Sequence, residues 1–243
     1  MSNKSRLFAL LFAIVGSGAA LAGPADKVYA PFVVKGETEF ELRGGYRDFD
    51  GAPSTHAFVF DVGRGITDRW KTELVLEYAG GGGERGKLEA VEWENILVLT
   101  EQGKYWADVG LFAEYEHVFG GGPDEIKIGP LFQKEFGPAI ANLNLVFERQ
   151  VGSGASTDIE LDYAWQVKWR GKESLQWGLQ GFGGLGAINH LGAGDKHSLG
   201  PAIFGVKRLA GGRKVSFDAA VLAGLNDAAP DVTVRFQLEY EIY

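Results

Sequence analysis

Apolar and polar residues alternate along most of the chain, and the stretch from Asp231 to Tyr243 shows the pattern most clearly. One parity of this stretch is apolar and consists of Val232, Val234, Phe236, Leu238, Tyr240 and Ile242. The other parity is polar and consists of Thr233, Arg235, Gln237, Glu239 and Glu241. A period of two indicates a β-strand with one apolar and one charged face. Strands of about ten residues with an apolar outer face are the unit of a transmembrane β-barrel.

The same alternation predicts about twelve strands. They cover residues 37–46, 55–64, 70–78, 88–99, 104–116, 126–136, 139–149, 158–170, 175–186, 197–208, 214–223 and 231–243. In the third strand, Trp70 and Tyr78 lie at the two ends of the apolar face, where the aromatic girdles of a membrane barrel would be. The predicted fold is all-β: one closed antiparallel transmembrane β-barrel formed by residues 23–243.

The connections between these strands alternate between long, glycine-rich loops and tight turns. Residues 80–87 form a long loop, whereas residues 65–69 form a short turn. Outer-membrane barrels have long loops outside the cell and short turns in the periplasm. An even number of strands then places both termini in the periplasm, together with the lead-in, residues 23–35.

Two descending strands contain the pairs Gly129-Pro130 and Gly200-Pro201. Proline donates no hydrogen bond to the ladder, and a closed barrel has no edge strand that could accommodate it. We therefore expect local bulges at both pairs.

A water-soluble lipocalin-like barrel or a sandwich would show the same alternation with its apolar face inside. Periodicity does not distinguish inside from outside. The number of strands and the aromatic residues at strand ends favour the membrane barrel.

Residues 1–22 have the features of a secretory signal peptide. Lys4 and Arg6 precede the apolar run 7–15, and Ala20-Leu21-Ala22 matches the small-x-small cleavage pattern. We predict cleavage before Gly23 and export to the outer membrane.

Composition narrows the classes of function. Cysteine is absent, which excludes disulfide scaffolds, thiolate metal sites and cysteine nucleophiles. The formal net charge is −8, and removal of Lys4 and Arg6 makes it −10. An acidic chain is a poor partner for nucleic acid and a better one for neutral or cationic solutes.

The export signal, the hairpin turn GITDRW from Gly65 to Trp70 and the alternating last strand together resemble Gram-negative outer-membrane β-barrels. The spacing of turns and hairpins along the chain is also similar to that in the transport barrels grouped with the MetA pathway of phenol degradation. The resemblance implies a passive path for small compounds, including aromatic ones. It also implies outer-membrane lipid, lipopolysaccharide and the barrel-assembly machinery as partners. Tyr243 departs from the family pattern, because it is out of phase with the outward positions.

The polar parity supplies the candidate residues of the lumen. They are Glu39, Glu41, Arg43, Lys71, Glu73, Glu92, Glu94, Asp108, Glu114, Glu160, Asp162, Lys168, Arg235 and Glu239. Salt bridges between neighbouring strands would fill the lumen with these side chains. Alternatively, they would line a narrow charged path, because twelve strands lie between filled eight-stranded barrels and open porins. Acidic residues outnumber basic ones, so an open path would favour cations or neutral solutes.

The histidines and serines offer little further chemistry. His190, Asp195 and His197 have side chains of metal-binding type, but we interpret them as solvated loop residues. Ser198 follows His197 on a predicted strand, where neighbouring side chains point apart. The sequence therefore predicts no catalytic residue, no metal site and no cofactor.

The function predicted from the sequence is a passive pore or transporter for a small solute, not an enzyme. Two alternatives stay open: a structural barrel without flux, and an outer-membrane hydrolase acting at the extracellular rim.

Overall fold

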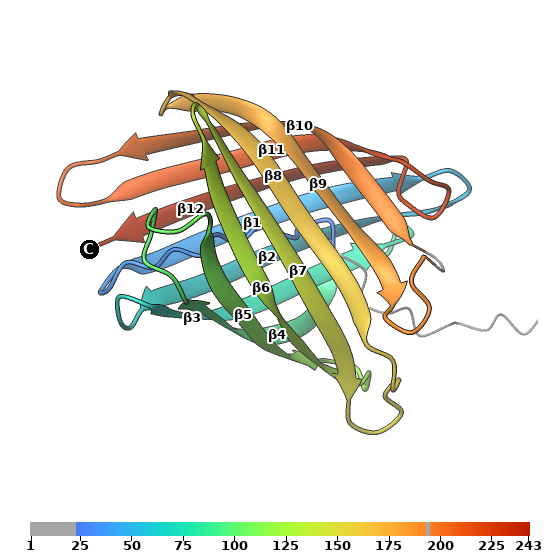
Figure 1. The fold of residues 1–243 in the computed structure, drawn as a ribbon. Helices are drawn as coiled ribbons and strands as arrows, with labels where there is room; N and C mark the ends of the chain where they lie inside the picture. The colour runs from blue at the N-terminus through green and yellow to red at the C-terminus, as the bar shows by residue number, and fades with distance from the viewer. Residues whose placement is uncertain (1–22, 193–194) are drawn as a thin grey trace, which may run out of the picture.

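A computed structural model describes residues 23–192 and 195–243, so the predicted signal peptide lies outside the described residues. Twelve antiparallel strands close into one barrel, in which each strand pairs with its neighbours in sequence and β1 pairs with β12 (Figure 1). The strands are β1 (Thr38–Phe49), β2 (Ala52–Gly65), β3 (Trp70–Gly81), β4 (Lys87–Val98), β5 (Asp108–Val118), β6 (Asp124–Phe136), β7 (Ala139–Val151), β8 (Glu160–Lys172), β9 (Leu175–Ala187), β10 (Lys196–Arg208), β11 (Lys214–Gly224) and β12 (Val232–Ile242). No helix in the described part of the chain is long and apolar enough to span a membrane.

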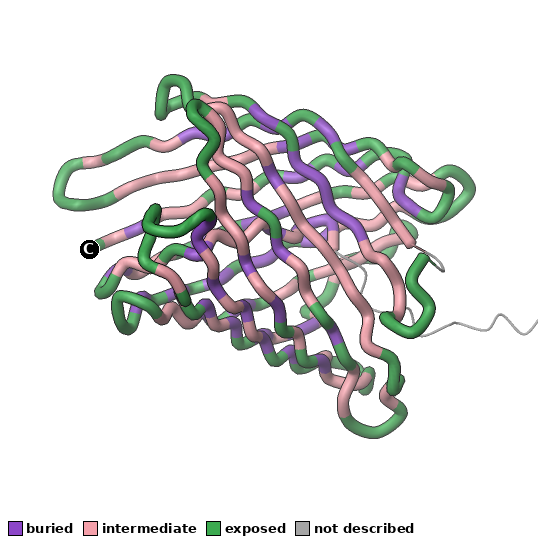
Figure 2. Tube along the Cα trace, in the orientation of Figure 1, coloured by how far each residue is buried: buried purple, intermediate pink, exposed green. Residues whose placement is uncertain are grey.

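The apolar parity faces outward and the charged parity faces inward. On β3, Leu74 and Leu76 are 57% and 41% exposed. Glu73, which precedes Leu74, and Val75, which lies between the two leucines, are buried. Exposed and buried positions alternate in this way along the strands (Figure 2). The structure thus confirms the membrane-barrel prediction, because a soluble barrel would enclose the leucines and expose the glutamates.

The two ends of the barrel differ. At one end, here called the turn end, short connections such as 137–138 and 173–174 join most of the strands, and the connection 99–107 is the longer exception. At the other, the loop end, most connections are longer, including residues 152–159 between β7 and β8. Two connections differ from the prediction. Asp50 and Gly51 form a tight turn at the loop end, and residues 104–107, predicted as strand, belong to the turn before β5.

The expected bulges at the two glycine-proline pairs are absent, and this prediction was wrong. Ile128 pairs with Phe147 and Leu131 with Asn144, so the register continues unchanged across Gly129-Pro130. A Cβ atom on Gly129 would lie 1.8 Å from the carbonyl oxygen of Leu145. The glycine therefore allows the neighbouring backbone to come close beside the proline, and no extra residue is needed.

The lead-in to β1 was also predicted wrongly. Residues 23–36, called the inner segment below, do not lie in the periplasm but run inside the barrel. Gly23 lies at the loop end against Glu77, and Gly36 donates a backbone hydrogen bond to Gly65 at the turn end. The chain thus descends through the bore before β1 begins. Gly23, the first described residue, and Tyr243 therefore lie at opposite ends of the barrel.

Candidate functional site in the barrel lumen

The inner segment is held by contacts on several sides of the bore. Ala25 is buried against the inward-facing Ala57, Val59 and Val75 of β2 and β3. Further down, Val33 packs against a second buried cluster that includes Ile96 of β4. These apolar contacts remove hydrophobic surface from water inside a lumen that is otherwise strongly polar.

Lys27 is the centre of the ion-pair network. It is 7% exposed, and four carboxylates from four strands surround its ammonium group. The distances from Lys27 Nζ are 3.3 Å to Glu41 Oε1, 3.4 Å to Glu73 Oε1, 3.7 Å to Asp61 Oδ2 and 3.9 Å to Glu94 Oε2. A buried charge is stable only when it is paired, so Lys27 and these strands stabilise one another in this arrangement.

Arg43 and Lys71 extend the network. Arg43 Nε lies 2.8 Å from Glu41 Oε1, and Lys71 Nζ lies 2.7 Å from Glu39 Oε2 and 3.3 Å from Glu73 Oε1. Even with these two cations, carboxylates remain in excess on the wall formed by β1 to β5. The field on this side of the bore is therefore negative.

Tyr29 connects opposite walls of the barrel. Its hydroxyl donates to Glu94 Oε1 on β4 at 2.8 Å, and its ring packs against Phe112 of β5. Its backbone N–H donates to Asn144 Oδ1 on β7 at 2.8 Å, and its carbonyl oxygen accepts from Asn144 Nδ2 at 2.9 Å. Asn144 thus satisfies both backbone groups of a residue that has no strand partner.

Two arginines bind backbone carbonyls of the inner segment. Arg43 of β1 donates to the carbonyl of Ala25 at 3.3 Å, and Arg235 of β12 donates to that of Asp26 at 2.7 Å. The segment is therefore bound by strands from both sides of the seam between β1 and β12.

The wall opposite the carboxylates is lined by amides. Asn142 donates to Gln133, Gln166 to Asn142 and Gln180 to Gln166, at 3.0, 3.2 and 3.2 Å. This chain crosses β6 to β9 and ends at Arg235, which donates to Gln180 and to Asp218. At the level of these amides the bore thus has an acidic wall and an uncharged polar wall, whereas Glu125, Glu148 and Asp162 of β6 to β8 lie nearer the loop end.

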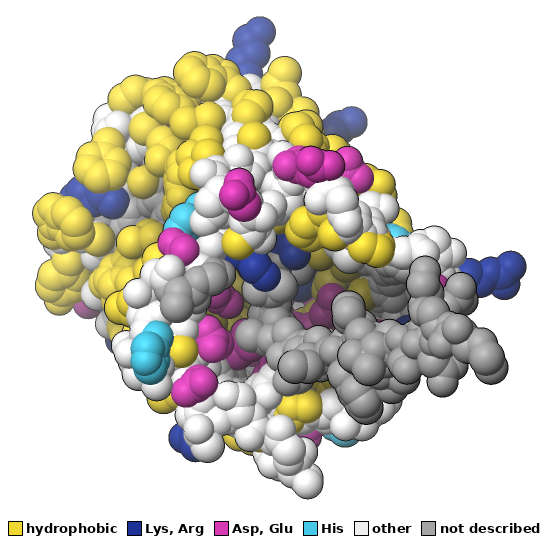
Figure 3. Space-filling model, turned by 90° about the vertical axis from the view of Figure 1, so that its right-hand side faces the viewer, with side chains coloured by type: hydrophobic (Ala, Val, Ile, Leu, Met, Phe, Trp, Pro, Cys, Tyr) yellow, Lys and Arg dark blue, Asp and Glu magenta, His cyan; other side chains and the backbone are white. Residues whose placement is uncertain are grey.

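A cavity of about 750 Å³ opens at the loop end, above the Lys27 network. Figure 3 views this end and shows acidic side chains inside the mouth, with hydrophobic side chains over the outer wall. The acidic residues that line the cavity are Asp26, Glu77, Glu84, Glu89, Glu92, Glu94, Glu114, Glu116, Glu125, Glu148 and Asp162. Tyr29, Phe112 and Phe182 contribute aromatic surface to the same cavity. A solute that enters here meets a negative, partly apolar chamber.

All fourteen predicted lumen residues are buried or half-buried, and none is exposed. The structure brings Glu41, Arg43, Glu73 and Glu94 together around Lys27. Glu39 and Lys71 join this group, Glu114 pairs with Lys127, and Arg235 pairs with Asp218.

Other predicted residues lie apart from that group. Asp108, at the turn end, accepts a hydrogen bond from the backbone N–H of Gly103. Lys168 lies over the ring of Phe204, 5.3 Å from its centroid. Glu92 and Asp162 line the loop-end cavity, and Glu160 and Glu239 are half-buried.

Sequence reasoning missed three kinds of lumen residue. Lys27 and Tyr29 lie on the inner segment, which looked like a linker. Asp61 has the inward parity of β2 and should have been found by the same alternation as Glu73. Asn144 belongs to the amide wall, which a pattern of charged residues does not reveal.

The histidine and serine candidates do not form a hydrolase-like arrangement. His197 Nε2 lies 2.8 Å from Asp195 Oδ2, and Nδ1 lies 2.7 Å from the hydroxyl of Tyr163. Both ring nitrogens therefore already have partners, and neither partner is Ser198. His190 is exposed on the preceding turn, and in the described ranges the histidines join no potential metal-binding group.

Comparison with solved structures shows the fold. The chain is similar to the COG4313 outer membrane channel from Pseudomonas putida F1, with a TM-score of 0.57, 10% identity and coverage of 89% of this chain and 98% of that one. Weaker likenesses include Omp33 of Acinetobacter baumannii, with a TM-score of 0.44, 10% identity and coverage of 86% and 98%. OpdK of Pseudomonas aeruginosa has a TM-score of 0.34, 12% identity and coverage of 87% and 100%.

At this identity the first likeness shows the fold alone, and the other two are too weak to add to it. No protein-family model matches the chain, and no curated protein matches it. The fold is that of Gram-negative outer-membrane barrels, as the sequence resemblance implied. The narrower resemblance to the MetA-pathway barrels is not confirmed.

Proposed function

We propose that the protein is a passive outer-membrane channel for small neutral or cationic solutes, constricted by its own inner segment. The observation that carries this proposal is the inner segment itself, which occupies the bore yet is held there by non-covalent contacts. A purely structural barrel could fill its lumen with side chains from the strands alone.

The charge distribution supports the proposed solute class. The acidic wall and the acidic cavity would attract cations and repel anions, and the amide wall offers donors and acceptors to uncharged polar groups. The aromatic surface of Tyr29, Phe112 and Phe182 adds contact area for a small organic molecule. In this proposal, outer-membrane lipid and lipopolysaccharide surround the barrel, which the assembly machinery inserts.

Planar-bilayer recordings test this function. Purified protein should show small, cation-selective conductance steps, because the inner segment narrows the path. Removal of residues 25–33 should enlarge the steps several-fold and leave the barrel folded, as judged by β-sheet circular dichroism. A barrel that stays silent both with and without these residues would contradict a transport role.

The same recordings separate the channel from the rim hydrolase. A channel conducts without consuming lipid or peptide, whereas turnover of either by a silent barrel would favour the enzyme.

A further inference from the structure

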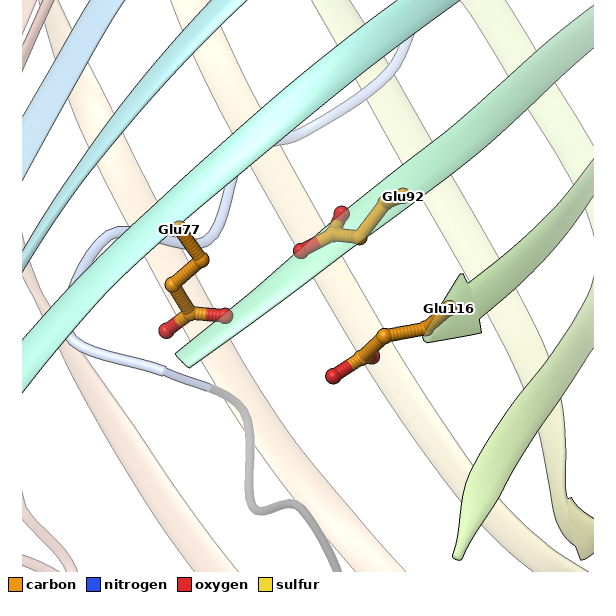
Figure 4. Close-up of side chains that lie close together, drawn as sticks. All are labelled: Glu77, Glu92 and Glu116. Carbon is orange, nitrogen blue, oxygen red and sulfur yellow. The ribbon is translucent and has the colours of Figure 1, made fainter. Parts of the chain in front are cut away.

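We propose that the loop-end cavity contains a binding site for a divalent cation of the Ca²⁺ class, formed by Glu77, Glu92 and Glu116. The site adjoins the Lys27 network, because an oxygen of Glu92 also lies within 4.8 Å of one of Glu94, but it does not rest on the proposed channel function. The three carboxylates come from β3, β4 and β5 and extend into the lumen side by side (Figure 4).

The spacing of the three carboxylates fits an ion. Each supplies an oxygen atom that lies within 4.8 Å of the oxygens of the other two. Ca²⁺ binds oxygen ligands at about 2.4 Å, so two ligands of one ion are at most about twice that distance apart. Three carboxylates supply up to six oxygens, and water from the cavity completes a coordination shell of six to eight.

Glu92 provides the independent evidence for a ligand. It is 8% exposed and lines the cavity, and in the described part of the chain Lys127 forms its ion pairs with Glu114 and Glu116 and not with Glu92. Its carboxylate points into the cavity toward Glu77 (Figure 4). A carboxylate in so enclosed a position is costly without a counter-charge, and a bound cation would supply that charge.

The strand register explains why the paired positions on the neighbouring strands supply no cation to Glu92. Glu92 lies directly opposite Glu116, which in turn lies opposite Glu125, so that three neighbouring strands place like charges side by side. Like charges at opposed positions destabilise a sheet. Lys127, which lines the same cavity, is already shared by Glu114 and Glu116 at 2.8 and 2.7 Å.

Ca²⁺ is a better fit than Mg²⁺. Mg²⁺ requires near-ideal octahedral geometry at about 2.0–2.1 Å and keeps several of its waters. The oxygens here come from long, flexible glutamates on three separate strands, and Ca²⁺ accepts such irregular geometry.

Calorimetric titration of the full barrel in detergent with CaCl₂ tests the site. Wild-type protein should show one saturable binding event. Glu92→Gln should weaken binding by at least about tenfold, because it removes a charged ligand and keeps the shape of the side chain. Glu77→Gln should also weaken it, and provides the test if Glu92→Gln does not fold.

Glu135→Gln is the matched control, because Glu135 is an exposed carboxylate at the turn end that pairs with Arg170. It should bind Ca²⁺ as the wild type does. Absence of saturable Ca²⁺ binding by folded wild-type protein would overturn the proposal, and so would unchanged binding by both cavity variants. Bilayer conductance plays no part in these measurements, so this result and the channel result are independent.

Discussion

Asn144 of β7 binds both the backbone N–H and the backbone carbonyl of Tyr29, although 115 residues separate the two. One side-chain amide thus replaces the two ladder bonds that a neighbouring strand would provide. This contact anchors the inner segment to the wall opposite the carboxylates.

Asn144→Leu should therefore loosen the inner segment. The substitution keeps the size of the side chain but leaves two partly buried backbone groups of Tyr29 unpaired, at a cost of up to about 1–3 kcal/mol for each. We expect larger and noisier channel steps in bilayers and a lower urea midpoint. Asn189→Ala, at an exposed loop position, is the control and should change neither. Unaltered steps in the Asn144 variant would show that the amide does not hold the segment.

Lys27→Met should make the channel more cation-selective. It removes the one ammonium group that Glu41, Asp61, Glu73 and Glu94 share, so the bore becomes more negative. Loss of one partner of a buried ion pair costs about 3–5 kcal/mol, so the barrel should also unfold more readily.

The reversal potential in a KCl gradient measures this effect, and it should shift toward the potassium equilibrium potential. Lys104→Met, on an exposed turn, should leave it unchanged. A shift toward anion selectivity would contradict the assignment of Lys27 to the conducting path.

Leu76→Lys tests whether the apolar outer face of the barrel wall contacts lipid. Leu76 lies near the middle of β3 on the outer face, where a lysine at the bilayer midplane costs about 2–4 kcal/mol. Urea titration of protein refolded into lipid vesicles, followed by tryptophan fluorescence, should show this loss. Leu191→Lys, in a loop, should be nearly neutral. Equal losses in both variants would argue against lipid contact at Leu76.

Gly129→Ala should destabilise the barrel where β6 and β7 approach each other. The added methyl group would lie 1.8 Å from the carbonyl oxygen of Leu145, so the backbone must move. Forced overpacking of this kind costs about 1–3 kcal/mol or more. Gly171→Ala is the control, since no atom lies within 4 Å of its added methyl group and its φ is not positive. Heat-modifiable migration on gels gives the comparison, and equal unfolding temperatures would refute the packing argument.

The sequence was sufficient to predict the strands because their alternation is local. Trp70 begins β3 as expected, and Ala139 begins β7 as expected. Tyr243 also behaves as its phase indicates: β12 ends at Ile242, and Tyr243 lies exposed beyond it. One turn boundary was predicted wrongly, because residues 104–107 continue the apolar pattern of a strand but belong to the turn before β5.

The content of the lumen was not predictable by the same means. Lys27 has partners on four strands, and no local pattern identifies contacts that only barrel closure creates. Pro24 and Pro31 made the inner segment look like a linker, since neither can donate a ladder hydrogen bond. One signal was present in the sequence: Val59, Val75 and Ile96 are apolar residues on inward positions, which require an apolar partner inside the bore.

The position of the inner segment has a consequence for biogenesis. It precedes β1 and is bound by Arg43 of β1 and Arg235 of β12, the two strands whose pairing completes the cylinder. If the barrel closed first, the inner segment would have to enter afterwards through a crowded, charged interior. The first and last strands should therefore pair while residues 23–36 are already in position, so that these residues enter the bore before the cylinder is complete.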